Sequence, residues 1–373
     1  MNEDMGDAVT RFLVERTRVR AEHVKLIDAW REVLARHPYP PIVAKALGEL
    51  MAGVALLSAT LKFDGSLLVQ MTGPGPVRML LAQADRTGGL RALARPAVEA
   101  TADDAQSNPS ERGGWRSTED WVAVADLQAA FERALAHSTA TVPTSDVPGA
   151  FTTTAPGQIP GLSDLLGSPA RLIITLEPPR GLEGGERYQG VVAIDGMTCV
   201  AEALDHYFTA SEQLPTRLWL AASHDARQAV AAGLLIQGLP DSTGAPMART
   251  TEDWKRMTIL ADTVRDDELC GLPFESLVGR LFAEEDLRRF ASTPLRFACS
   301  CSRARVEAML RALGDEEVED LLDDGRVSVT CEFCNTCYEF DAVDLEALRH
   351  APETVQADHR LAESGTTDTG RQH

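Results

Sequence analysis

The chain has 373 residues, of which 44% are hydrophobic and 25% are charged, and its formal net charge is −20. This length and balance suit one large globular domain with a smaller module, and they exclude a chain that is disordered throughout. A field of that sign repels nucleic acid and anionic membrane surfaces, so neither is expected as a partner. The N-terminus, Met1-Asn2-Glu3-Asp4, is acidic and has no apolar core of a signal peptide, so no secretory signal is expected.

The first 240 residues predict a domain of mixed helices and strands. Val9, Phe12 and Leu13 have helical spacing and predict a helix within 7–35. A second helix is predicted at 42–58, followed by strands at 60–63, 67–71, 77–83, 171–176, 189–194 and 216–222, with a helix at 198–212.

The longest apolar run, 42–61, contains Lys45 and Glu49. These charges predict a core helix followed by a strand, and they argue against a membrane span.

Residues 97–170 are rich in Ala, Ser, Thr, Pro, Asp and Gly, and they predict an insertion-like loop with one helical patch at 121–135. The polar tail, 351–373, is predicted to be disordered.

A helical linker is predicted over 241–293, with a second helical stretch at 277–290. Its first helix carries an apolar stripe, here called the linker stripe: Trp254, Met257, Leu260, Ala261 and Val264. Such a stripe is usually packed core. Between a main domain and a metal-dependent module, it is also a surface whose burial could depend on that module.

Four cysteines near the C-terminus form two close pairs, Cys299 with Cys301 and Cys331 with Cys334. Each pair places two sulfurs on one local turn, and the chain between the pairs is long enough to fold back. Four thiolates can then surround a tetrahedral Zn²⁺ at roughly 2.3 Å. We therefore predict one zinc ion per chain.

The zinc module is predicted to span 294–350, with a helix capped by Ser302, a second short helix from Asp315 and a hairpin whose turn is 331–334. A piece this small buries too little apolar surface to fold without its metal. Acidic residues outnumber basic ones within it, unlike a zinc ribbon that binds nucleic acid.

The remaining cysteines have weaker patterns. Cys337 follows Cys334 by three positions and could replace a ligand, act as a resolving thiol or have no role, and the last is the preferred interpretation. Cys199 and Cys270 stand alone in apolar contexts and are predicted to be buried core residues.

The sequence has no GxSxG, HExxH or Walker loop, which are common enzyme motifs. A zinc deaminase needs an open coordination position, which four cysteine ligands would close. The protein is not expected to be an enzyme.

The segments Cys-Ser-Cys-Ser-Arg at 299–303, Gly-Asp-Glu-Glu-Val at 314–318 and Cys-Glu-Phe-Cys at 331–334 resemble the zinc module of the heat shock protein 33 family, also called the 33 kDa chaperonin. The N-terminal domain of that family is similar to further segments at 56–65, 75–78, 188–191, 206–208 and 211–217. The expected fold class is α+β, with an N-terminal mixed sheet-and-helix domain, a helical linker and a small C-terminal four-cysteine zinc module.

The resemblance implies a cytoplasmic, redox-regulated, ATP-independent holdase chaperone that is zinc-bound and inactive when reduced. Oxidation would release the zinc, form disulfides and unfold the linker, and the active form would keep unfolding or oxidatively damaged proteins from aggregating. Cys299, Cys301, Cys331 and Cys334 match the family's zinc ligands and redox-active cysteines, with disulfides expected between 299 and 301 and between 331 and 334. Unfolded client proteins are the implied partners, and a homodimer is one implied form of the oxidised state.

Two features depart from the family pattern: Cys337 is an additional thiol, and 97–170 is longer than expected. The competing hypothesis is a constitutive zinc-ribbon protein-interaction module with a purely structural zinc. Peroxide-dependent zinc release coupled to suppression of aggregation belongs only to the chaperone.

Overall fold

The computed structural model describes residues 6–61, 64–97, 160–178, 187–211, 214–225, 228–313, 315–322 and 325–350. The predicted helical patch at 121–135, most of the insertion at 97–170 and the tail at 351–373 lie outside the described residues.

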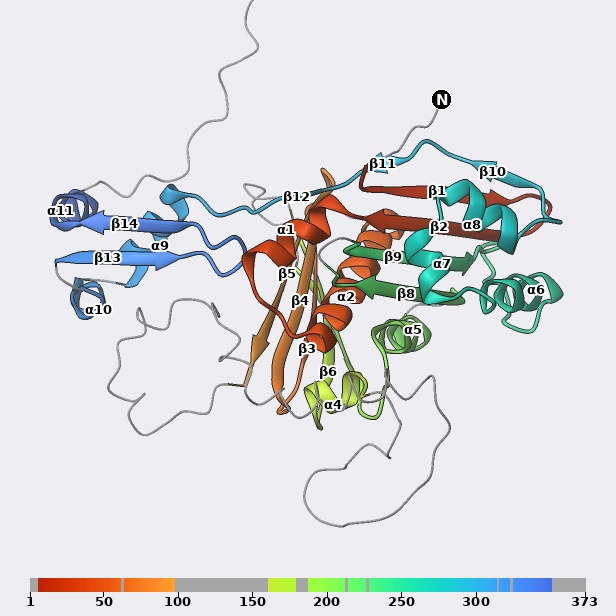
Figure 1. The fold of residues 1–373 in the computed structure, drawn as a ribbon, viewed down its shortest axis with the longest axis horizontal. Helices are drawn as coiled ribbons and strands as arrows, with labels where there is room; N and C mark the ends of the chain where they lie inside the picture. Colours follow the sequence, from red (N-terminus) through yellow and green to blue (C-terminus); the bar gives the residue numbers. More distant parts are fainter. Residues whose placement is uncertain are drawn as a thin grey trace, which may run out of the picture.

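Two β-sheets form the larger part of the fold (Figure 1). In the described residues, sheet A has the order β10 (Leu287–Arg289), β1 (Ala8–Val14), β2 (Val19–Leu26), β9 (Val230–Gly238) and β8 (Thr216–Ser223), and β11 (Thr293–Pro294) also pairs with β1. Sheet B has the order β12 (Arg296–Phe297), β5 (Gly89–Pro96), β4 (Val77–Asp85), β3 (Ser66–Thr72), β6 (Arg171–Glu177) and β7 (Tyr188–Ala193). Adjacent strands are antiparallel, except that β12 runs parallel to β5.

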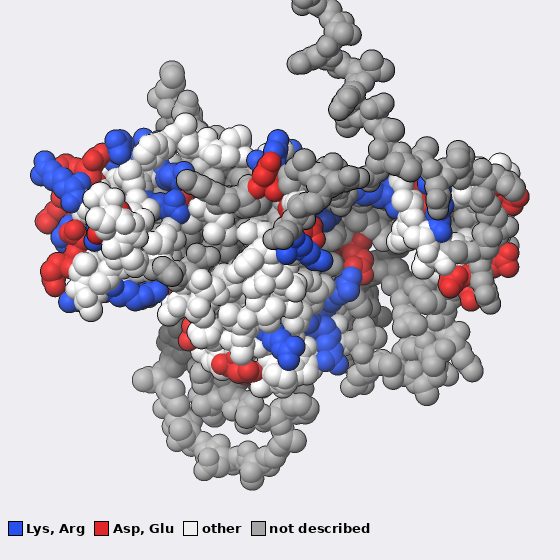
Figure 2. All heavy atoms as spheres, turned by 180° about the vertical axis from the view of Figure 1, so that it is seen from behind, with Lys and Arg blue, Asp and Glu red and all other residues white. Residues whose placement is uncertain are grey.

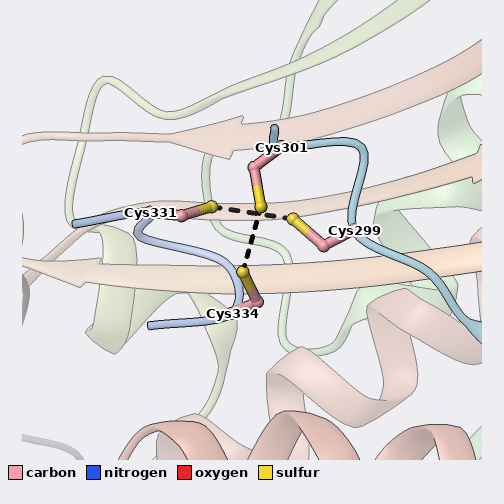
Figure 3. Close-up of side chains that lie close together, drawn as sticks. All are labelled: Cys299, Cys301, Cys331 and Cys334. Carbon is pink, nitrogen blue, oxygen red and sulfur yellow. Dashed lines mark hydrogen bonds between the residues drawn. The ribbon is translucent and has the colours of Figure 1, made fainter. Parts of the chain in front are cut away.

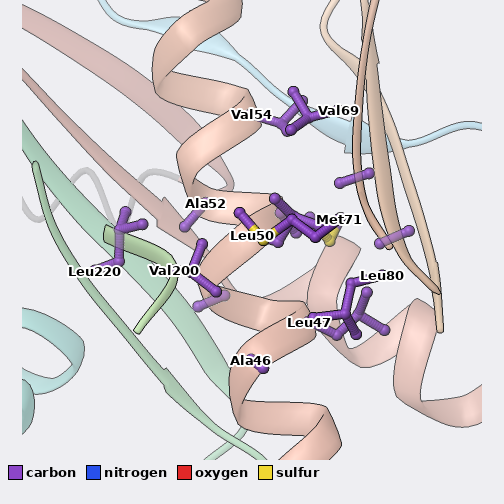
Figure 4. Close-up of a cluster of buried hydrophobic side chains, with 14 of the residues drawn as sticks. Ala46, Leu47, Leu50, Ala52, Val54, Val69, Met71, Leu80, Val200 and Leu220 are labelled. Carbon is purple, nitrogen blue, oxygen red and sulfur yellow. The ribbon is translucent and has the colours of Figure 1, made fainter. Parts of the chain in front are cut away.

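Helix α2 (Pro41–Thr60) packs between the two sheets and forms the centre of the core. Figure 4 shows Val69, Met71 and Leu80 of sheet B on one side of α2, with Leu220 of sheet A on the other. Pro41 starts the helix at a position where a proline costs no hydrogen bond. Each fully buried Leu or Val along it contributes about 1.5–3 kcal/mol of transfer free energy.

In the part of the chain that the structure describes, three shorter helices belong to the same part of the fold, here called the body: α1 (Asp28–Arg36), α4 (Leu162–Leu166) and α5 (Val200–Ser211). Among the described residues, α2 is the one helix long and apolar enough to cross a membrane, and 83% of its most apolar window is buried inside the protein. The predicted core helix at 42–58 is confirmed.

The predicted helix at 7–35 is wrong in its first two thirds, which form the hairpin of β1 and β2 before α1 begins at Asp28. Val9 faces the core around α2, whereas Phe12 and Val14 face the linker helices. A strand that is apolar on both faces loses its two-residue alternation, and the spacing of Val9, Phe12 and Leu13 then imitates a helix.

Three linker helices pack on the outer face of sheet A: α6 (Glu252–Ala261), α7 (Asp266–Gly271) and α8 (Phe274–Leu281). Trp254 and Met257 of the linker stripe are 4% and 0% exposed, in a cluster with Phe12 and Val14. Lys45 also joins α2 to α7, because its Nζ lies 2.8 Å from Glu49 Oε1 and 3.1 Å from Asp266 Oδ2. The linker stripe is therefore covered by the body.

The second predicted linker helix, 277–290, is too long. Helix α8 ends at Leu281, and Leu287–Arg289 pairs with β1 as β10 because the edge of sheet A offers free backbone partners. The chain then continues through β11 into β12 of sheet B. Residues 287–297, here called the strap, thus join both sheets.

The C-terminal module contains α9 (Arg303–Leu313), α10 (Asp315–Asp320), β13 (Arg326–Thr330), β14 (Cys337–Asp341) and α11 (Ala342–His350). Its two predicted helices and hairpin are present, and α11 is an addition. A small core holds the module together: Leu310, Val318, Val327, Phe340 and Leu345.

In Figure 1 the module lies at the opposite end of the molecule from α6, α7 and α8. The domain limits at 240, 293 and 350 stay predictions.

His23 of β2 is a buried base under the linker. Its ring lies 5.5 Å from that of Phe274 in α8, and its Nε2 has no hydrogen-bond partner among the described residues. Burial, with a smaller contribution from Lys25, lowers the pKa of His23 to about 4. A proton on this ring would therefore be disfavoured in the folded chain.

Acidification should weaken the fold through His23. As pH falls below about 6.5, the unfolded chain takes up a proton that the folded chain resists, so this contribution to stability is full above pH 6.5 and is lost toward pH 4. The loss should be on the order of 2–3 kcal/mol. Urea unfolding at pH 7 and pH 4.5 should show a smaller loss in His23→Leu than in wild type.

His206→Gln is the matched control, because His206 is exposed on α5 and its replacement should leave the wild-type pH dependence unchanged. The cysteine thiols are common to all three chains, so their protonation cancels in the comparison. Identical pH dependence in wild type and His23→Leu would contradict the assignment.

Candidate metal centre

The four predicted cysteines meet at one point. Cys299 and Cys301 lie between β12 and α9, and Cys331 and Cys334 lie in the turn between β13 and β14, here called the knuckle (331–334). Figure 3 shows the four sulfurs directed toward one another. All four Sγ atoms lie within 4.8 Å of one another, with 3.6 Å between Cys299 and Cys331 and 3.2 Å between Cys301 and Cys334.

This arrangement fits a tetrahedral metal site. Four sulfurs at 2.3 Å from a central zinc ion would lie about 3.8 Å apart. The two separations of 3.6 and 3.2 Å lie slightly below that value, and all four sulfurs are within 4.8 Å of one another, so small side-chain rotations suffice to bring the sulfurs to it. The cluster could hold a metal ion.

Backbone pairing places the first cysteine pair. Phe297 is paired with Leu90, and the N–H of Ala298 donates to the carbonyl oxygen of Leu90 (2.9 Å), which fixes the chain just before Cys299 on the edge of sheet B. Ser302 Oγ then accepts from the N–H of Arg305 (3.3 Å), as expected for a residue that caps α9.

The knuckle is closed by two backbone hydrogen bonds. The N–H of Cys331 donates to the carbonyl oxygen of Thr336 (2.9 Å), and the N–H of Asn335 donates to that of Cys331 (2.8 Å). Asn335 has φ of 55°, a left-handed conformation that asparagine tolerates better than most residues. The turn thereby presents both of its sulfurs on one side.

The thiols of the cluster share protons. The hydrogen bond from Cys331 lowers the pKa of the Cys299 thiol to about 4, and the same bond raises the pKa of Cys331. Burial raises the pKa of Cys301, against the effect of the Tyr338 hydroxyl, which donates to its Sγ (3.2 Å). A cluster that stabilises a thiolate in this way suits a cation that would replace the shared protons.

The other cysteines lie outside the cluster. Cys337 is exposed on β14, and its Sγ lies 3.0 Å from Ser328 Oγ; its neighbour Tyr338, on the opposite face of the strand, points to the sulfurs. Cys270 is half-buried and packs beside the linker core, where burial raises its pKa to about 11. The prediction for Cys199 is wrong: it is exposed, because it lies in the surface turn that leads into α5.

Sequence analysis missed three body residues at the site: Arg91 and Arg95 of β5, and His37 after α1. Arg91 Nη1 lies 3.8 Å from Cys299 Sγ, although the two residues are 208 positions apart. His37 Nε2 donates to the carbonyl oxygen of Glu332 (2.6 Å). One sequence signal could have indicated this contact. Arg91 and Arg95 are four positions apart and so lie on one face of a strand, and the CxxC turn contains an acidic residue, Glu332, with which they could pair.

Comparison with known proteins agrees with this geometry. The family model described as Hsp33 protein matches residues 7–341. The 33 kDa chaperonin of Nitrosococcus oceani is 39% identical over 343 residues, covering 92% of this chain and 94% of that protein. The 33 kDa chaperonin of Methylobacillus flagellatus is 37% identical over 346 residues, with 92% and 94% covered.

A solved structure shows the same fold. The crystal structure of the 33 kDa chaperonin from Thermotoga maritima, at 20% identity, matches with a TM-score of 0.62 and covers 91% of this chain and 97% of that one. The fold and the sulfur cluster define an α+β body that carries a four-cysteine module. The chain belongs to the Hsp33 family.

Cys331→Ser should abolish metal binding, because it removes one of the four clustered sulfurs. Elemental analysis of the wild type purified with a reductant should give about one zinc per chain, and the variant should give close to none. Cys337→Ser is the matched control and should keep the wild-type content. Equal loss in both variants would place Cys337 among the ligands.

Proposed function

We propose that this protein is a redox-regulated, ATP-independent holdase chaperone, inactive when reduced and zinc-bound, and activated by oxidation. The observation that carries the proposal is the cluster of four thiol sulfurs at the junction of body and module, in a chain of the Hsp33 family. The relatives are named chaperonins, which favours a binding function over an enzymatic one.

Cys299, Cys301, Cys331 and Cys334 would hold one zinc ion. When bound, zinc joins the two cysteine pairs and supplies much of the module's folding free energy, on the order of 10–16 kcal/mol for small zinc peptides. Among the described residues of the module, five buried apolar side chains form its core, which is little for an independent fold.

Oxidation would act on the sulfurs in pairs. Two thiolates and one hydrogen peroxide, with two protons, give one disulfide and two waters; the two electrons pass from sulfur to peroxide oxygen. We assign the disulfides to Cys299 with Cys301 and to Cys331 with Cys334, as in the pattern of the family. A disulfide sulfur carries no thiolate charge, so each pair would release the metal.

Loss of the module would reach the linker through the strap. Cys299 lies two residues after β12, and the strap supplies edge strands to both sheets between α8 and Cys299. Detached linker helices would uncover the apolar outer face of sheet A, including Phe12 and Val14, and the linker stripe. Unfolded client proteins would bind such apolar surface, and a second oxidised copy could bind it as well.

The surface charge is consistent with this assignment. In Figure 2, acidic and basic side chains alternate at one end of the visible face, while its middle is mostly uncharged. Many of the arginines are engaged in ion pairs with the acidic residues, such as Arg256 with Glu285 at 2.7 Å. We infer a cytoplasmic protein without affinity for nucleic acid or membranes, given its net charge of −20.

The alternative, a constitutive zinc-ribbon module that binds another protein, is not favoured. A ribbon of that kind presents its knuckle to a partner, whereas this knuckle lies against the chain's own body. The position of the cysteines at that contact suits a switch better than a permanent scaffold.

Peroxide with mild warming should release zinc and switch on suppression of aggregation with one time course. Zinc release is measured with a chromogenic indicator, and activity as light scattering of heat-unfolded luciferase without ATP. A thiol reductant with added zinc should reverse both. Cys337→Ser should behave as wild type. In Cys331→Ser, suppression of aggregation should no longer depend on peroxide. A protein that keeps its zinc under peroxide and gains no suppression of aggregation would support the constitutive module.

A further inference from the structure

The knuckle lies against strand β5 and the end of α1. Arg95 of β5 forms an ion pair with the carboxylate of Glu332, and the side-chain amide of Asn335 donates to the carbonyl oxygen of Arg36. With the hydrogen bond from His37 to Glu332, these contacts fasten to the body the turn that carries Cys331 and Cys334.

Arg91 is a body residue whose side chain reaches one of the clustered sulfurs. Its guanidinium carbon lies 4.0 Å from the centre of the Phe333 ring, and its Nη1 lies 3.8 Å from Cys299 Sγ. Gln83 on the neighbouring strand β4 fixes the guanidinium, since its Oε1 accepts from Arg91 Nε (2.8 Å) and Nη2 (2.6 Å). One body side chain thus touches a member of the first cysteine pair and a residue between the members of the second.

The chemical effect of this contact follows from the state of the sulfur. A free thiol beside an arginine becomes more reactive, because more of it is thiolate. A metal-bound sulfur is already deprotonated, so the guanidinium adds no thiolate; it lowers the nucleophilicity of the sulfur and orients it for the metal. The stacked ring of Phe333 also covers one side of the guanidinium.

We propose that Arg91 is a positioning residue of the redox switch: it holds Cys299 and the knuckle together on β5 and thereby slows oxidative loss of the metal. The proposal rests on the proposed function and adds to it that the body completes the surroundings of the sulfur cluster. Undocking of the knuckle and loss of the metal would then promote each other.

The test compares rates of zinc release under peroxide for purified, reduced full-length chains. Arg91→Ala should release zinc about 10-fold faster or more, as is typical when a partner of a metal ligand is removed. Arg91→Lys keeps the charge but not the planar fork, and should fall between Arg91→Ala and wild type. Arg86→Ala is the matched control, because Arg86 is an exposed arginine paired with Asp64; it should match wild type.

A double-mutant cycle separates positioning from general stability. Phe333→Leu removes the ring under the guanidinium, so its effect on the release rate should be largely lost when Arg91 is already alanine. Arg95→Ala breaks the ion pair with Glu332, a docking contact that involves no sulfur, and should accelerate release less than Arg91→Ala. All of these variants should have the same midpoint of urea unfolding of the body as the wild type, which shows that their general stability is unchanged.

The outcomes are distinguishable. A wild type that holds no zinc, or keeps it under peroxide, would overturn the proposed function. A wild type that releases zinc, with Arg91→Ala releasing it at the wild-type rate, would overturn the role of Arg91 alone. Additive effects of Arg91→Ala and Phe333→Leu would also contradict it. Should Arg91→Ala fail to fold, Arg91→Lys and Phe333→Leu decide the same question by their rates.

Discussion

The meeting of four thiol sulfurs within 4.8 Å is the constraint on which the C-terminal part of this structure depends. Two of the sulfurs follow a strand of the body, and the other two sit on a hairpin turn of the module. Thiols gathered so closely compete for protons, and a divalent cation relieves that competition. The state of the sulfurs therefore bears directly on whether the module stays attached.

The strap extends this dependence to the linker. Its short strands lie at the edges of both sheets, where each contributes few backbone hydrogen bonds, and it lies in the chain between α8, which ends at Leu281, and Cys299. The core around α2, by contrast, is enclosed by both sheets, and among the residues that the structure describes it shares no buried residue with the module. Regions with few buried contacts open at lower free energy than the core. The module has a small core and the strap pairs through short strands, so both can open while the core around α2 stays intact.

Much of the site could be predicted from the sequence, because a CxC and a CxxC around a capped helix constrain each other locally. The helix after Ser302 and the hairpin that turns at Cys331 could be predicted from local sequence patterns. The core helix could be predicted from the length of its apolar run. The failures came from tertiary context. Strand β1 is buried on both faces, so its sequence lacks the alternation by which a strand is predicted. Leu287–Arg289 was predicted as helix but forms a strand, because it pairs with β1. Arg91 lies 208 positions from Cys299, a separation that no local pattern spans.

Hydrogen exchange followed by mass spectrometry, on the reduced zinc-bound protein and after peroxide with mild warming, tests the central claim most directly. The account predicts that exchange rises in the module, in the strap and across α6, α7 and α8, while α2 and the inner strands of both sheets stay protected. Faster exchange confined to the module, with α6, α7 and α8 unchanged while client binding appears, would contradict it.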